Sequence, residues 1–91
     1  MKETIAERIH NRRRDLKMSM DELGVSMGFK TANRKTAVYH IESGGNRLRI
    51  ERLPSTAAAL KTSVYYLLGY INDADITDDE ILSILNNHEQ E

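Results

Sequence analysis

The chain has 91 residues, of which 40% are hydrophobic and 30% are charged, so it can form one domain with a modest core but not a large enzyme. It has no cysteine, which excludes disulfides, thiolate metal sites and cysteine nucleophiles. The net charge of −1 conceals an asymmetry: residues 1–52 carry twelve Lys and Arg against seven acids (+5), whereas residues 53–91 carry one Lys against seven acids (−6). Such an asymmetry either indicates that the basic half faces nucleic acid or reflects arginines on the solvated faces of a small helical protein, and charge alone does not decide between the two.

The sequence gives no sign of a membrane segment or of secretion. Its apolar runs are a few residues long, whereas a membrane-spanning helix needs roughly 20. The first ten residues are polar and charged, where a signal peptide needs an apolar stretch. We therefore expect a cytoplasmic protein that makes no membrane contact.

Two capping boxes predict the first two helices. Thr4 with Glu7 opens a helix of about three turns, and Ser19 with Glu22 opens a short second helix that ends at Gly28. One stripe of the first helix contains Ile5, Ile9, Arg13 and Leu16, and the inner face of the second contains Leu23 and Met27. Met18, Met20 and Met27 are expected to pack in or beside the core.

Three further helices are predicted between residues 33 and 69. Asn33 is a candidate N-cap for the third helix, and the run Ser-Gly-Gly-Asn at 43–46 ends it. Pro54 suits the first turn of a fourth helix, and Ser63 caps a fifth that ends at Gly69. The inner faces contain Ala37, Val38 and Ile41, and then Leu53, Ala57 and Leu60.

The composition changes after Tyr70 to an acidic, linker-like stretch, INDADITDDE. Thr77 with Glu80 predicts one more helix, which extends to about His88. Its apolar stripe contains Ile81, Ile84 and Leu85. The sequence thus predicts a domain over residues 1–70 and, over residues 71–91, an acidic linker with a C-terminal helix for dimerisation or partner binding.

Three closely spaced helices, the second ending in Gly and the third basic, are typical of a helix-turn-helix. In this order and spacing, residues 5–69 resemble the Cro/repressor family of DNA-binding domains from temperate phages and bacterial regulators. The matching pieces are Ile9 and Arg13, MSMDEL at 18–23, Met27 and Gly28, AVYHIESG at 37–44 and LPSTAAALKTSVYYLLG at 53–69. The resemblance implies an all-α, five-helix, lambda-repressor-like domain, here followed by a C-terminal helix. It also implies a bacterial or phage-encoded protein that is associated with the nucleoid.

The chain departs from the family pattern at three places. Met20 stands where the family usually has Gln, whose amide touches a phosphate. Gly24 replaces a common Ala, which lowers helix propensity and keeps close packing possible. The turn after Gly28 is about four residues longer than usual.

The resemblance also implies roles for particular residues. The residues expected to contact bases or the groove are Arg34, Lys35, Thr36, Tyr39 and His40. Phosphate or minor-groove contacts fall to Asn33, Ser43, Asn46, Arg47 and Arg49, a role that Arg52 could share. Arg13 and Glu42 match a structural ion pair between the first and third helices. A dimer or partner surface is expected at Tyr66, Ile81, Ile84 and Leu85.

Plainer interpretations of the same residues stay open. Residues 34–36 could form a solvated face, Tyr39 could pack half-buried, and His40 could be inert. In the run Arg12-Arg13-Arg14, one member is expected to be structural and the others solvated or near phosphate. The three histidines, His10, His40 and His88, lack ligand spacing, so we expect no metal site and no cofactor.

The sequence predicts a sequence-specific regulator of transcription that binds double-stranded DNA. We expect a phage or prophage repressor that binds an inverted repeat as a homodimer. One alternative is a DNA-binding antitoxin whose C-terminal helix holds a protein partner. Another is a protein-interaction module on the same fold that binds no DNA. No nucleophile elbow, phosphate loop or paired-carboxylate motif is found, so we predict that the chain is not an enzyme.

Overall fold

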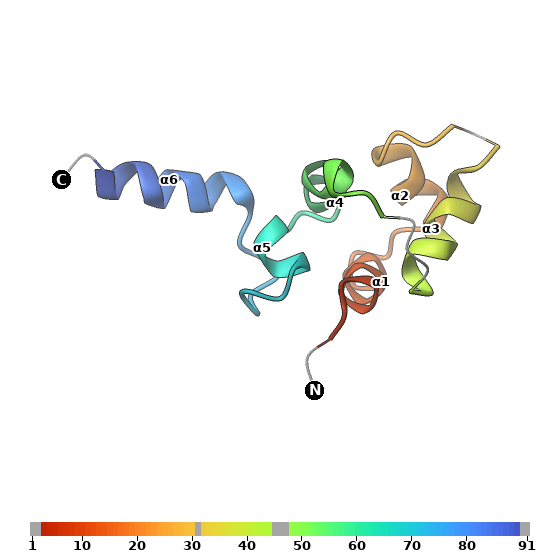
Figure 1. Ribbon diagram of the computed structural model, residues 1–91, viewed down its shortest axis with the longest axis horizontal. Helices are drawn as coiled ribbons and strands as arrows, with labels where there is room; N and C mark the ends of the chain where they lie inside the picture. Colours follow the sequence, from red (N-terminus) through yellow and green to blue (C-terminus); the bar gives the residue numbers. More distant parts are fainter. Residues whose placement is uncertain (1–2, 31, 45–47, 90–91) are drawn as a thin grey trace.

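The computed structural model describes residues 3–30, 32–44 and 48–89, and the regular elements in this part of the chain are all helices, without strands (Figure 1). In chain order the elements are α1 (Ile5–Asp15), α2 (Met20–Ser26), α3 (Arg34–Glu42), a 3-10 turn η1 (Ile50–Arg52), α4 (Leu53–Ala59), α5 (Val64–Leu67) and α6 (Asp78–Glu89). The all-α prediction is confirmed.

Local capping explains where α1 and α2 begin. The Glu7 and Glu22 amides donate to the hydroxyls of Thr4 and Ser19, and the Thr4 and Ser19 amides donate back to the two glutamates, at 2.9 to 3.1 Å. Each box satisfies two backbone donors that the first turn of a helix leaves free. Gly28 then adopts φ +87° directly after α2, a conformation that favours glycine.

The predicted caps of the later helices differ in detail. The Tyr66 amide donates to the Ser63 hydroxyl at 3.0 Å, so Ser63 caps α5 as predicted. Asn33 lies at the N-cap position of α3, but its side chain makes no capping hydrogen bond because its backbone is already near-helical, with φ −118° and ψ −7°. That part of the prediction is wrong.

One core joins the first five α-helices. It is formed by the buried side chains of Ile9, Leu23, Met27, Val38, Ile41, Leu53, Ala57, Leu60, Tyr66 and Leu67. These side chains lie on the stripes that helical periodicity selects in the sequence. Met18 and Met20 pack at the edge of this core, as expected.

The chain after α5 is held against α1 before it forms α6. The Arg8 guanidinium donates to the Ile71 carbonyl at 2.8 Å and to Asn72 Oδ1 at 2.9 Å, and Arg12 Nη1 lies 3.2 Å from Asp75 Oδ1. Residues 71–75 are therefore tied to the domain, in contrast to the free linker that their composition suggests. From there α6 extends away from the other helices (Figure 1).

Candidate nucleic-acid interface

Helices α2 and α3 pack closely against each other, and Gly24 makes this close packing possible. A Cβ atom built on Gly24 would lie 2.6 Å from the Arg34 Cβ and 3.0 Å from the Arg34 carbonyl oxygen. Real Cβ atoms do not come this close to other heavy atoms, so even alanine would push α3 outward. Gly24 thus sets the position of the first residue of α3.

Helix α3 has a buried face and an exposed face. Val38 and Ile41 are buried in the core and anchor the helix. Lys35, Thr36 and Tyr39 are exposed on the other side, and Tyr39 retains 56% of its accessible surface. The side chains of one exposed helical face can therefore meet a partner without moving the core.

His40 is half-buried on the same helix. Its ring meets the Tyr39 ring edge-on, with the centroids 5.7 Å apart. Lys35, Thr36 and Tyr39 thus share the exposed side of α3, and His40 lies half-buried beside Tyr39.

A buried ionic cluster joins α1 to the C-terminal end of α3. Arg13 Nε and Nη2 donate to the two Glu42 oxygens at 2.6 and 3.0 Å, and Arg13 Nη1 donates to the Met18 carbonyl at 2.8 Å. His10 Nδ1 lies 2.7 Å from Glu42 Oε1, a contact that sequence reasoning did not anticipate. Since two charges must leave water to form such a pair, its main effect is to fix geometry and not to add net stability.

At the other end of α3, Arg34 forms an ion pair with Asp21 of α2. Arg34 Nε lies 2.6 Å from Asp21 Oδ1. The hydrogen bond from Arg34 lowers the pKa of Asp21, and the same hydrogen bond raises the pKa of Arg34. Arg34, a predicted base or groove contact, is thus oriented by a carboxylate that the sequence analysis did not single out.

The predicted phosphate-contact residues are only partly described. Asn33, Ser43 and Arg49 are exposed, and the Ser43 hydroxyl donates to the His40 carbonyl at 3.2 Å. Asn46 and Arg47 lie outside the described residues.

Arg52, the further candidate for a phosphate contact, lies against the C-terminal end of α2. Its Nη1 donates to the Met27 carbonyl at 2.7 Å, and its guanidinium lies 4.2 Å from the centroid of the Phe29 ring. Arg52 therefore closes the C-terminal end of α2.

Tyr66 was expected at a dimer or partner surface, and this prediction is wrong. Its side chain is only 8% exposed, because the Arg8 guanidinium covers its ring at 4.4 Å from the centroid. At the end of α5 the exposed side chains are instead Tyr65, Leu68 and Tyr70. Ile84 and Leu85 of α6 are exposed, and Ile81 is half-buried.

The arginines of α1 are more structural than the sequence analysis predicted. Arg12 donates to the Leu60 and Lys61 carbonyls at 2.8 and 2.9 Å, so two members of the 12–14 run are structural instead of one. Arg8 is buried and also donates to the Tyr66 carbonyl. The helical period could have placed these two arginines near the core, because Arg8 and Arg12 each follow an isoleucine of the predicted apolar stripe by three residues.

The described residues contain no group of three or more His, Asp or Glu side chains that could hold a metal ion. Within the same part of the chain, no helix is long and apolar enough to cross a membrane. Comparison of the chain with protein-family models, curated protein sequences and solved structures gives no match.

Proposed function

We propose that the protein is a sequence-specific regulator of transcription that binds double-stranded DNA. In this proposal α2 and α3 form the helix-turn-helix of a lambda-repressor-like domain, and α3 enters the major groove. The supporting observation is the two-faced α3, which buries Val38 and Ile41 and presents Lys35, Thr36 and Tyr39 to solvent. The major groove admits one helix whose outer face carries hydrogen-bond donors and apolar groups.

The two ends of α3 are held by different contacts, which suggests different roles for Arg34 and Lys35. The Arg13–Glu42 cluster holds the C-terminal end of α3, and Gly24 sets its N-terminal end against α2. Lys35 is exposed beside Arg34, whose guanidinium is partly neutralised by Asp21. Lys35 is therefore the principal candidate for reading a base, while Arg34 is directed by its carboxylate partner.

A single recognition helix reads only a few base pairs, so we propose that two copies bind an inverted repeat. The two α3 helices would then lie about 34 Å apart, one turn of B-DNA. A phage or prophage repressor is the context that the sequence resemblance suggests. The proposal assigns no catalytic step to the chain.

A DNA-binding antitoxin is the second candidate. The observation that favours it is the exposed apolar surface of α6, formed by Leu82, Ile84 and Leu85. In that case a different protein would cover α6, and the same α3 would bind DNA.

The test is a binding titration at two salt concentrations. The probes are the DNA upstream of the protein's own gene and a shuffled duplex. Nanomolar affinity for the first probe and much weaker, salt-sensitive affinity for the second support the proposal. No binding to either probe at low salt would contradict it and favour a protein-interaction role.

Two variants and a control test which residues contact the DNA bases and which contact the phosphates. We expect Lys35→Ala to weaken specific binding about 5- to 150-fold, corresponding to the roughly 1–3 kcal/mol of a base contact, with a smaller effect on the shuffled probe. We expect Arg49→Ala to weaken both probes equally and to reduce the salt slope by about one unit. Lys61→Asn removes an exposed charge between α4 and α5, at a left-handed position (φ +51°) that Asn tolerates, and serves as the control. Equal losses on both probes for Lys35→Ala would contradict its assignment as a base reader.

A further inference from the structure

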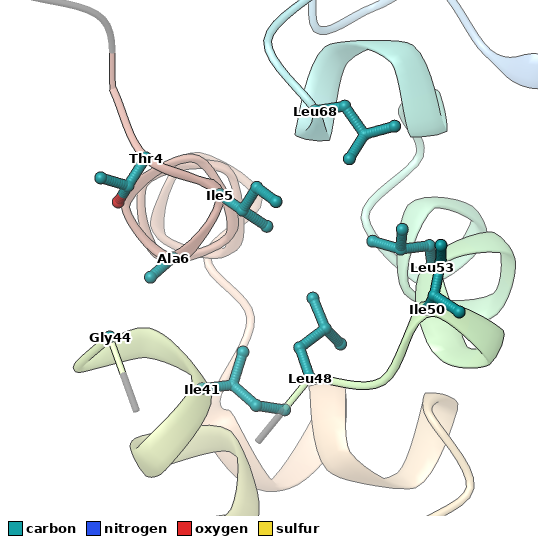
Figure 2. Close-up of a pocket in the computed structure, with 9 residues that line it drawn as sticks. All are labelled: Thr4, Ile5, Ala6, Ile41, Gly44, Leu48, Ile50, Leu53 and Leu68. Carbon is teal, nitrogen blue, oxygen red and sulfur yellow. The ribbon is translucent and has the colours of Figure 1, made fainter. Parts of the chain in front are cut away.

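A groove of about 460 Å³ opens between the N-terminal end of α1, the C-terminal end of α3 and the beginning of α4 (Figure 2). Its lining is almost entirely apolar: Thr4, Ile5, Ala6, Ile41, Gly44, Leu48, Ile50, Leu53 and Leu68. Ile5 of α1, Leu48 in the connection before η1 and Leu68 just after α5 point toward its centre (Figure 2). Ile41 and Leu53 are buried, whereas Ile5, Ile50 and Leu68 remain exposed to solvent in the monomer. An apolar hollow of this kind favours an apolar occupant.

The same chain carries a second exposed apolar surface on α6. Leu82, Ile84 and Leu85 are about half exposed along a twelve-residue helix, which is about 18 Å long. Isolated helices of this length are marginal in water, so α6 gains stability when a partner covers this face.

The α6 helix is anchored where it begins, at a distance from its own groove. The Val64 amide donates to Asp78 Oδ1 at 2.9 Å, and Arg12 holds Asp75. From this anchor α6 extends away from α1, α3 and α4 (Figure 1). Both the groove and the apolar face of α6 are therefore left for a second molecule.

We propose that the groove of one copy receives the α6 helix of a second copy, and that the exchange is reciprocal. A second copy supplies both missing surfaces at once through a two-fold axis. This inference rests on the homodimer of the proposed function and adds the surface through which the two copies meet.

The exposed apolar area is large enough for a specific dimer interface only if each copy inserts its α6 into the groove of the other. The six most exposed side chains of the two surfaces retain between 36 and 76% of their accessible surface: Ile5, Ile50, Leu68, Leu82, Ile84 and Leu85. Together they expose about as much surface as three fully exposed Leu or Ile residues, so covering them once removes roughly 500 Å² and covering them in both copies removes about 1,000 Å². The reciprocal contact thus reaches about the lower limit for a specific interface. We therefore expect a dimer of modest affinity that depends on concentration.

The test is sedimentation of the full chain without DNA, across a wide range of concentrations. Ile50→Glu removes the groove contact and Leu85→Glu removes the α6 contact, and both side chains are exposed enough for the fold to tolerate the change. Val25→Glu, at a half-exposed apolar position on α2, is the matched control. We expect Ile50→Glu and Leu85→Glu each to weaken dimerisation about tenfold or more, and Val25→Glu to leave it unchanged. Circular dichroism confirms that each variant is folded.

Mixing the two variants separates this arrangement from its rivals. An Ile50→Glu copy keeps an intact α6, and a Leu85→Glu copy keeps an intact groove. Because this α6 can enter this groove, the mixture should form heterodimers more readily than either variant forms homodimers. If α6 pairs only with α6, Ile50→Glu will dimerise like the unmodified chain, and the proposal is wrong. A chain that stays monomeric at every concentration would also overturn it, leaving these surfaces to a different protein. Because no DNA is present, either failure is separate from a failure to bind DNA.

Discussion

Replacing Gly24 with alanine distinguishes helix propensity from helix packing. In an exposed helix interior this change stabilises by about 1 kcal/mol, because alanine is the better helix former. Here the new Cβ would meet the Arg34 Cβ at 2.6 Å and the Arg34 carbonyl oxygen at 3.0 Å. Neither atom belongs to the flexible end of a side chain, so α3 must shift as a whole.

The packing cost exceeds the gain in propensity. Overpacking of this kind costs typically 1–3 kcal/mol, and contact with rigid atoms places Gly24→Ala toward the upper end of that range. We therefore expect a net destabilisation of about 1–2 kcal/mol. For a domain of this size, the corresponding fall in melting temperature is roughly 5 to 15 °C.

Thermal unfolding followed by circular dichroism measures this effect. Ser26→Ala, at an exposed position of the same helix, gains propensity without a clash and should raise the melting temperature slightly. If Gly24→Ala raises the melting temperature as Ser26→Ala does, then α2 and α3 do not approach as closely as described here, and the reasoning is refuted.

Three other changes have predictable effects on stability. Glu42→Gln leaves Arg13 buried beside a neutral amide, so urea unfolding should show a loss of about 3 kcal/mol or more; a loss near zero would show that the pair is not buried in solution. Lys17 has φ +56° just after α1, where glycine is favoured, so Lys17→Gly should stabilise by about 0.5–1 kcal/mol in the same assay, and a loss of stability would contradict that backbone conformation. The folded-state pKa values of Glu7 and Asp21 are lowered by hydrogen bonds from Thr4 and Arg34, so their contribution is complete above the unfolded pKa near 4 and is lost as the pH falls through the lowered values. An acid titration of the melting temperature should show this loss below about pH 4, and a melting temperature that is flat there would contradict it.

Local sequence signals predicted most of the helices, because each depends on residues a few positions apart. The boxes at Thr4 and Ser19 and the glycine after α2 specify helix ends through bonds within one turn. The apolar stripes in turn select the core, including Val38 and Ile41. These features could be predicted because they involve no choice between distant partners.

The contacts that sequence reasoning missed join distant parts of the chain. Arg8 donates hydrogen bonds to residues about sixty positions away. Its place three residues after Ile5 indicates which face of α1 it lies on, but does not indicate its partners. Burial of Tyr66 follows from that contact and could not be predicted from its own neighbours. The Asp21–Arg34 pair spans the long turn between α2 and α3, where spacing along the sequence gives no register.

In the candidate site, too, local features could be predicted from the sequence and contacts between distant residues could not. The exposed face of α3 follows from its helical period, since the buried Val38 and Ile41 fix which side faces outward. The partner of Glu42 came from a family resemblance, whereas the position of α3 depends on Gly24 and Arg34. Residues 33–43 could thus be selected as a candidate surface, but the groups that orient them required the structure.

The central claim is that the exposed face of α3 binds DNA, and an NMR titration with a selected operator duplex tests it most directly. Fragments that bind the protein are first selected from a random duplex library, and the amide shifts are then followed residue by residue. We predict that the largest shift changes occur at Lys35, Thr36 and Tyr39 and are reduced by Lys35→Ala. No selectable duplex, or shift changes confined to α6 and the apolar groove, would contradict the claim.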